Sequence, residues 1–310
     1  MASAAASPAP AWVILGSVPR VLTEAAASSA LPPGPGAADF SLALLPPPRV
    51  ALLTIPPRIF PSRPTSASFP CVLAADPSAG LLLLHADQGR ATGPTVIDKP
   101  GCQQFGWLPF VAGYYVLDAA AGSALPLPTP ELVSYKGDLG LIAYPDGDGY
   151  LVAELQPVFG SDKAVLLRFS SKVGEWVRER VAYPLPARLH SPHGVVSCYG
   201  RLWWVDLSWC LVTCDPFADD PVLTRPTNPD VVYFFLDEHL IGVDVRARKV
   251  VGCEVYELVD EPPREGVASS LVHAWQLPPD LTLYSGSAKE TVNDNGICRE
   301  AILHRSNRWF

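Results

Sequence analysis

Residues 139–155 read Leu-Gly-Leu-Ile-Ala-Tyr-Pro-Asp-Gly-Asp-Gly-Tyr-Leu-Val-Ala-Glu-Leu. Two apolar segments, Gly140–Tyr144 and Tyr150–Leu155, flank the turn sequence Asp146-Gly147-Asp148-Gly149. Asp-Gly pairs are favoured in tight hairpin turns because glycine adopts positive φ angles without strain. The stretch therefore predicts two antiparallel strands joined by a tight turn, and residues 194–205 predict a second hairpin of the same kind.

A strand-and-turn pattern recurs along the chain. In five places an apolar strand ends in Asp, or once in Ser, and is followed by a polar turn and a returning apolar segment. The strands are Cys71–Asp76, Tyr114–Asp118, Val165–Ser170, Leu211–Asp215 and Leu240–Asp244, returning at Leu81–Leu84, Leu125–Leu127, Trp176–Val181, Val222–Leu223 and Val250–Leu258. The last residues of these strands lie 42, 52, 45 and 29 positions apart. The first three intervals match the roughly 40 to 50 residues of a propeller blade.

These intervals predict an all-β fold, a propeller-like array of antiparallel β-sheets that is incomplete. We interpret each marked hairpin as the outer pair of a four-stranded blade, with the Asp side chain bonding its own turn. The hairpins Gly140–Leu155 and Gly194–Val205 supply inner strands. A β-sandwich is the alternative, because short strands with regular turns occur in both architectures.

The interval from Asp215 to Asp244 is too short for a blade. A normal interval holds the outermost strand of one blade and three strands of the next, but only Val222–Leu223, Val231–Leu236 and Leu240–Val243 are available here. This predicts an incomplete blade with an unpaired strand edge and exposed apolar surface. An internal deletion or a mis-spliced gene model is the simplest explanation of the short interval.

The pattern divides the chain into a disordered N-terminus, residues 1–11, a single propeller-like β domain, residues 12–280, and a poorly packed tail, residues 281–310. The tail is polar and carries no repeat signature. We expect Trp12–Leu15 to form a strand close to His273–Leu277, because propellers remove their open edge by pairing the two ends of the chain.

Composition restricts the fold and the partners. The 34 Pro and 23 Gly leave room for one short helix, Val21–Ser29, which argues against an α/β enzyme fold. The 23 basic and 31 acidic residues give a net charge of -8, and phosphate contacts with nucleic acid are not expected. No apolar run approaches the roughly 18 residues of a membrane-spanning helix, so no membrane association is expected.

The cysteines form an odd set with irregular spacing and no secretory signal before them. This predicts reduced thiols in the cytoplasm or nucleus. The seven residues are Cys71, Cys102, Cys198, Cys210, Cys214, Cys253 and Cys298.

Two groups of residues carry the chemistry of a catalytic or zinc site. His190-Ser191-Pro192-His193 places a hydroxyl within reach of two imidazoles, but the chain has no Gly-x-Ser-x-Gly elbow and we favour a solvated loop. His193, Cys198, Cys210 and Cys214 could gather around zinc, yet their gaps of 4, 11 and 3 residues match no zinc motif. Strand cysteines more often behave as small buried apolar residues.

Two further groups have simpler explanations. Asp146-Gly147-Asp148-Gly149 is like a shortened calcium loop without its later ligands, and a hairpin turn accounts for it. Trp203, Trp204 and Trp209 could line a ligand platform, but we favour core packing. The sequence also has no phosphate loop, dinucleotide fingerprint or metalloprotease helix. We therefore predict no catalytic, cofactor-binding or metal-binding residue and no cofactor.

Several segments, taken together, resemble the grass proteins that carry domain of unknown function 1618. They are Trp12–Leu15, Tyr115–Asp118, Leu151–Leu155, Trp204–Leu207 through Cys214-Asp215-Pro216, Asn228–Leu236 and His273–Trp275. The resemblance covers residues from about 10 to 280, and the most specific family region begins at about residue 204. It implies a grass as source and no established activity or catalytic residues. It is similar in style to the propeller domains that accompany F-boxes in plants, although the first 60 residues lack the helical periodicity of an F-box.

The function expected from these features is a non-enzymatic, β-propeller-like module that binds another protein, because repeated blades offer a broad rigid surface. One alternative is a propeller hydrolase or sugar-binding enzyme with its site in the central channel. The other is a truncated gene product without stable function. The sequence leaves enzymatic activity uncertain and the oligomeric state open.

Overall fold

The computed structural model describes the greater part of the chain. The residues described are 12–31, 38–91, 95–99, 102–106, 110–128, 136–158, 160–185, 194–206, 210–224, 231–236, 239–244, 247, 249–256, 272–278, 281 and 300–304. The predicted disordered N-terminus, residues 1–11, and most of the predicted tail lie outside them.

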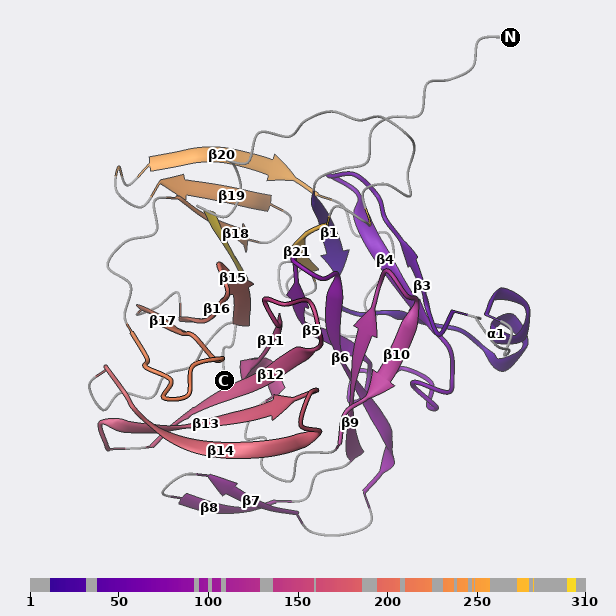
Figure 1. Cartoon of the computed structure of the whole chain (residues 1–310). Coiled ribbons are helices and arrows are strands. Elements are labelled where there is room, and N and C mark those ends of the chain that lie inside the picture. Colours follow the sequence, from indigo (N-terminus) through magenta and orange to yellow (C-terminus); the bar gives the residue numbers. More distant parts are fainter. Residues whose placement is uncertain are drawn as a thin grey trace.

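Five β-sheets stand around a common centre (Figure 1). From the innermost strand outward, sheet 1 contains β21 (Val272–Gln276), β1 (Trp12–Gly16), β4 (Val50–Ile55) and β2 (Arg20–Val21), with β3 (Ser41–Ala43) also paired to β4. Sheet 2 contains β5 (Cys71–Asp76), β6 (Leu81–Arg90), β9 (Phe110–Asp118) and β10 (Ser123–Pro126). Sheet 3 contains β11 (Leu139–Ala143), β12 (Tyr150–Pro157), β13 (Lys163–Ser170) and β14 (Glu175–Ala182).

The remaining two sheets come from the second half of the chain. Sheet 4 contains β15 (Gly194–Cys198), β16 (Arg201–Asp206) and β17 (Cys210–Cys214), and sheet 5 contains β22 (Glu300–His304), β18 (Val231–Leu236), β19 (His239–Asp244) and β20 (Lys249–Val255). Outside the five sheets are the hairpin of β7 (Thr95–Lys99) and β8 (Cys102–Gly106), the helix α1 (Glu24–Ala30) and the 3₁₀ turn η1 (Lys136–Asp138). The helix overlaps the one predicted at Val21–Ser29, but Arg20–Val21 form β2 and the helix begins at Glu24.

The innermost strands form a ring in the order β5, β11, β15, β22 and β21, each beside the next. An all-β, propeller-like array with an incomplete part is therefore confirmed, and the sandwich alternative is wrong, because the sheets surround a centre instead of stacking in two layers. Most strand pairs are antiparallel; β1 and β2 pair with β4 in parallel, and β18 pairs with β22 in parallel.

One buried carboxylate shows that four of the inner strands run in the same direction. Asp76 ends β5, and its Oδ2 accepts hydrogen bonds from the Ala143 backbone at the end of β11 and from the Ser197 hydroxyl near the end of β15. The Asp76 carbonyl accepts the indole N–H of Trp275, near the end of β21. These four strands therefore end together around Asp76 and begin together at the opposite end of the ring.

Apolar clusters fill the spaces between neighbouring sheets. Separate cores lie between sheets 1 and 2, sheets 2 and 3, sheets 3 and 4, and sheets 5 and 1. Close packing between sheets 3 and 4 requires Gly140, because a Cβ at this position would lie 2.5 Å from a methyl group of Val195. Within the described residues no such cluster joins sheets 4 and 5.

The two ends of the domain meet as predicted. β1 pairs with β21 in antiparallel register, from Trp12 opposite Gln276 to Gly16 opposite Val272. The predicted closure of Trp12–Leu15 against the segment that begins at His273 is therefore confirmed.

The first copy of the repeat pattern is not equivalent to the other four. β5 and β6, which carry Asp76, are the inner pair of sheet 2, whereas the copies ending at Asp118, Ser170, Asp215 and Asp244 belong to outer pairs. The prediction of an outer pair is wrong for this copy. Asp76 and Asp118 each accept two N–H groups of the turn that follows them. The sequence pattern therefore indicates a turn, but it does not indicate whether the turn joins an inner or an outer pair of strands.

The short interval after Asp215 does leave a blade incomplete. Within the described residues sheet 4 has three strands, and a fourth is reduced to the single bridge between Thr213 and Thr224. Sheet 5 takes its innermost strand, β22, from the C-terminal tail and in parallel orientation. The tail therefore contains a paired strand that the sequence did not predict. A deletion or mis-splicing as the origin of the short interval stays a prediction.

Candidate functional site

Buried polar side chains gather at the end of the ring where the inner strands begin. Ten polar or charged residues of the described chain are buried, and seven belong to this end: Ser17, Ser68, His85, Asp87, Glu154, Gln156 and Asp206. We call these seven the axial polar cluster. The others are Asp76 and Ser197, which meet at the opposite end, and Thr213 of sheet 4.

Strand register places these residues at the same end of their sheets. In each of sheets 1 to 4, the second strand runs antiparallel to the inner strand, so it ends where the inner strand begins. His85 lies opposite Cys71, the first residue of β5, and Glu154 lies opposite Leu139, the first residue of β11. Asp206 ends β16, one residue after the partner of Gly194. Ser17 follows Gly16 of β1, which pairs with the first residue of β21.

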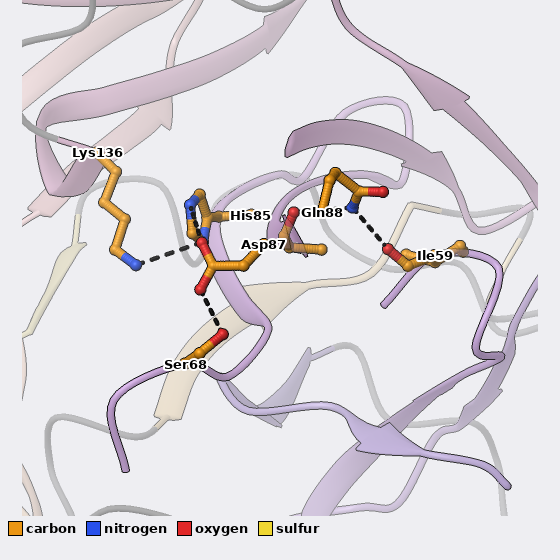
Figure 2. A network of polar contacts seen from close by, with 7 residues as sticks. Ile59, Ser68, His85, Asp87, Gln88 and Lys136 are labelled. Atoms are coloured by element: carbon orange, nitrogen blue, oxygen red, sulfur yellow. Dashed lines mark hydrogen bonds and ion pairs between the residues drawn. The ribbon is translucent and has the colours of Figure 1, made fainter. Parts of the chain in front are cut away.

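His85 is at the centre of a polar network that joins sheet 2 to the start of sheet 3 (Figure 2). The ammonium of Lys136, in η1, is 3.3 Å from His85 Nδ1. Because an ammonium can only donate, Nδ1 is the acceptor and the imidazole proton is on Nε2, which is 3.5 Å from Asp87 Oδ1. The Ser68 hydroxyl donates to Asp87 Oδ2 at 2.6 Å, and the ring of Tyr114 packs edge-on against His85.

Two further side chains near this network, Gln88 of β6 and Gln156 of β12, make hydrogen bonds at the ends of their strands. The amide of Gln88 donates to the carbonyls of Ile59 and Ala86, both at 2.9 Å, and so ties the end of β6 to the segment after β4. On β12 the Gln156 amide donates to Glu154 at 2.7 Å. The second of these contacts holds the Glu154 carboxylate in position.

The surroundings shift two pKa values strongly. Burial, together with the nearby Lys136 ammonium, lowers the pKa of His85 from 6.5 to about 3. Burial also raises the pKa of Tyr114 well above its ordinary value, and the carboxylates of Glu154 and Asp87 add to that increase. The two carboxylates, one from sheet 3 and one from sheet 2, therefore act on the same phenol.

The network has the residue types of a hydrolase triad but not its arrangement. The Ser68 hydroxyl donates to Asp87, and the described contacts show no hydrogen bond between this hydroxyl and His85. A general base works best with a pKa near the operating pH, which a pKa of about 3 does not provide. In this arrangement Ser68 donates to a carboxylate and is not activated as a nucleophile.

We expect the folded chain to lose stability in mild acid. His85 is neutral in the folded state and becomes protonated below about pH 6.5 when unfolded, so stability is present above that pH and falls as the pH drops towards 3. Burial lowers the pKa of His273 as well, in the same sense. The His85 contribution lost between pH 7.5 and 5.0 is about 2 kcal/mol. Urea unfolding at the two pH values measures it.

The control for this prediction is the variant His85→Gln. The glutamine amide does not titrate in this range, so the difference between the two pH values should shrink by about 2 kcal/mol. An unchanged difference would mean that His85 is protonated in the folded chain.

The structure separates two of the residues considered as zinc ligands, Cys210 and Cys214. Cys210 begins β17 beside Asp206, and Cys214 ends the same strand, roughly 13 Å away at about 3.3 Å per residue. Cys214 is fully buried, and burial raises the pKa of its thiol to about 11, as expected for an apolar core residue. His190-Ser191-Pro192-His193 lies outside the described residues. In the described part of the chain no group of three or more His, Cys, Asp or Glu could hold a metal ion.

The other two predicted groups have structural roles. Asp146 forms the expected hairpin turn, with Gly147 and Gly149 at positive φ, and its carboxylate pairs with Lys172. Trp204 is fully buried between sheets 3 and 4 and donates its indole N–H to the Asp138 carbonyl. Trp203 is half-buried, and Trp209 lies outside the described residues.

The axial polar cluster was missed by the sequence analysis. Its signal is visible in retrospect: β6 is apolar from Leu81 to Leu84 and then alternates polar and apolar through His85 and Asp87. β12 shows the same change at Glu154. Polar residues at the buried end of an apolar strand are a general indication of a polar site.

Comparisons with known proteins add little. No known family model matches the sequence, and no curated protein is significantly similar to it. Solved structures that are weakly similar in shape include the following two. A candidate dipeptidyl aminopeptidase IV from Bacteroides ovatus has a TM-score of 0.27 and 10% identity over 61% of this chain and 34% of its own, so this chain spans about a third of that protein. AztD from Citrobacter koseri, in its apo form, has a TM-score of 0.24 and 12% identity over 74% of this chain and 76% of its own.

None of the helices in the described residues is both long and apolar enough to cross a membrane.

Proposed function

We propose that this chain is a non-enzymatic protein-interaction module and that its partner adds an extended strand to the outer edge of sheet 5. The observation that carries the proposal is the exposure of β20. All seven residues from Lys249 to Val255 are exposed, and Val250, Val251 and Val255 each expose more than half of their surface. An exposed edge strand with β-branched residues is a template for pairing with another chain.

Two other outer strands, β14 and β10, are protected in ways that β20 is not. β14 carries the charged residues Glu175, Arg178, Glu179 and Arg180, and β10 ends in Pro126. Charges and proline on an edge strand oppose pairing with another chain. β20 has charges only near its ends, at Lys249 and Glu254, and Gly252 at its centre adds no bulk.

The charge network around His85 supports a non-enzymatic role. Ser68 bonds to Asp87, and the imidazole is a weak base with a pKa of about 3. A hydrolase would need a nucleophile hydrogen-bonded to a base of suitable pKa.

The test is capture of partners from a plant extract by the full chain, followed by the variant Val251→Lys. We expect this variant to retain its melting temperature, because exposed substitutions change stability by within about 0.5 kcal/mol, and to weaken binding of the captured partner at least about tenfold. The matched control is Val177→Lys on β14, where the side chain is 50% exposed. The thiol of Cys253, which is exposed on β20, should become protected from alkylation when the partner is bound.

Two results would contradict the proposal. Equal capture by the wild-type chain and Val251→Lys would place the interface elsewhere. Turnover of a small substrate without any reproducible partner would favour the enzymatic alternative.

A further inference from the structure

The outer edge of sheet 5 carries a charge pattern that is complementary to itself. β20 is the last strand on its side of the sheet, and Figure 1 shows it at the periphery, outside β19. Its charged residues are Lys249, the first residue of the strand, and Glu254, the last but one, and the residues between them are uncharged. When two copies of such a strand pair in antiparallel orientation, the positive end of each lies beside the negative end of the other.

A register shift in sheet 5 places these two charges on the same face of the strand. Lys249 is opposite Asp244 and Glu254 is opposite Leu240, and these two residues of β19 are four positions apart. Residues an even number of positions apart on a strand share a face, and so do residues directly opposite each other. Lys249 and Glu254 therefore share a face although they are five positions apart, because the register shifts by one residue between them. In a regular strand they would lie on opposite faces.

Neither charge is used within the described part of the chain. Lys249 and Glu254 are exposed, and the ion pairs formed among the described residues include neither of them. Asp244, which is opposite Lys249, accepts the backbone N–H of Ala247 with its carboxylate. A second copy in antiparallel orientation supplies each of the two charges with a partner of opposite sign.

Gly252, near the middle of β20, is a second indication. A Cβ at this position would have no described atom within 4 Å, and its φ lies outside the positive range that favours glycine. Glycine weakens the interior of a strand, and it is typical of sites where another backbone approaches closely. If Lys249 lies beside Glu254 of a second copy, Val251 and Gly252 flank the axis that relates the two strands.

We propose that the strand which pairs with β20 is β20 of a second copy of this chain, in antiparallel orientation around a two-fold axis. The proposal rests on the interaction proposed for β20 and identifies its partner. Val250 and Cys253 share the other face of the strand, since they are opposite Val243 and Ile241, and each lies beside the other's counterpart in the second copy. A two-fold interface of this kind makes every contact twice.

The first test is reversal of the two charges in the full-length chain, with dimerisation measured by analytical ultracentrifugation. Lys249→Glu and Glu254→Lys should each weaken dimerisation at least about tenfold, because each creates two like-charged pairs at the interface. An equimolar mixture of the two variants should dimerise as the wild-type chain does, because each variant supplies the charge that the other needs. The matched control is Arg178→Glu, an exposed charge reversal on β14, which should leave dimerisation unchanged.

The second test is the register of the two strands, which oxidative cross-linking measures. The double variant Val250→Cys with Cys253→Ser is mixed with the wild-type chain, so that each thiol has its counterpart only in the other copy. We expect a disulfide between positions 250 and 253 in the mixture and none at these positions in either chain alone, because identical positions are offset along the strands. Val255→Cys with Cys253→Ser is the matched control, since Val255 is 53% exposed and Val250 55%, but position 255 is distant from Cys253 of the second copy. Peptide mass spectrometry identifies the linked cysteines.

Three outcomes would overturn the proposal. They are a chain that stays monomeric at roughly 100 μM, a mixture of charge-reversed variants that does not recover dimerisation, and equal cross-linking through positions 250 and 255. If the chain is monomeric but Val251→Lys loses a partner captured from the extract, the second copy is wrong and the proposed function stands. If the chain is monomeric and Val251→Lys captures the same partners as the wild-type chain, both proposals are wrong.

Discussion

Replacing Asp76 with Ala should destabilise the chain by about 4 kcal/mol. The carboxylate is 1% exposed and accepts five hydrogen bonds, from the Ser78 backbone and hydroxyl, the Ala79 and Ala143 backbones and the Ser197 hydroxyl. The substitution leaves two buried donors, on sheets 3 and 4, without an acceptor, and each unsatisfied donor costs about 1 to 3 kcal/mol. Urea unfolding followed by tryptophan fluorescence measures the loss.

Asp118→Ala is a closely matched control for this variant. Asp118 accepts two backbone N–H groups of its turn at 2.9 Å, as Asp76 does, but these bonds are exposed and reach no other sheet. Loss of the turn contacts alone should cost about 0.5 to 1 kcal/mol. Asp76→Asn keeps a side-chain oxygen that can accept the turn N–H groups. Its loss of stability should therefore lie between those of Asp118→Ala and Asp76→Ala. Similar losses for Asp76→Ala and Asp118→Ala would show that Asp76 does not connect the sheets.

Removing the side chain of Trp275 should cost about 3 to 5 kcal/mol and loosen the closure of the ring. Trp275 is 1% exposed, packs in the core between sheets 1 and 2, and donates to the Asp76 carbonyl at 3.2 Å. Trp275→Ala leaves a large cavity as well as an acceptor without its donor. Hydrogen exchange should accelerate in β1, because β1 pairs with the strand that holds Trp275.

Trp275→Phe separates the two contributions, since it keeps most of the volume and removes the hydrogen bond, and we expect a loss of about 1 to 2 kcal/mol. Trp176→Ala, on the partly exposed β14, is the control for loss of an indole away from the closure. Faster exchange of β1 in Trp176→Ala, to the same extent, would mean that closure does not depend on Trp275.

The sequence predicted those features that are encoded locally. Tight turns such as Asp146–Gly149 are specified by residues that tolerate positive φ, and the hairpins they join were found where predicted. Closure of β1 on β21 was also predicted, because an exposed strand at each end of a ring has few other partners.

The sequence could not reveal features that depend on position in the ring. Asp76 and Asp118 carry the same turn chemistry, and only the neighbouring sheets distinguish a connecting carboxylate from an ordinary turn. The pairing of β22 with β18 joins residues about 70 apart and has no turn to signal it. The axial polar cluster was missed for the same reason, because its members are far apart in sequence and only strand register places them at the same end of the sheets.

The pairing of β1 with β21 has a consequence for how the protein is made. β1 leaves the ribosome long before the strand that pairs with it, because Trp12 and its partner Gln276 are about 260 positions apart. At a translation rate of about 5 to 20 residues per second, β1 would lack its partner strand for roughly 13 to 50 seconds. Contacts of such long sequence separation also slow folding after release. The nascent chain should therefore depend on chaperones that shield an apolar strand edge, and any truncation before residue 272 should leave a chain that cannot close.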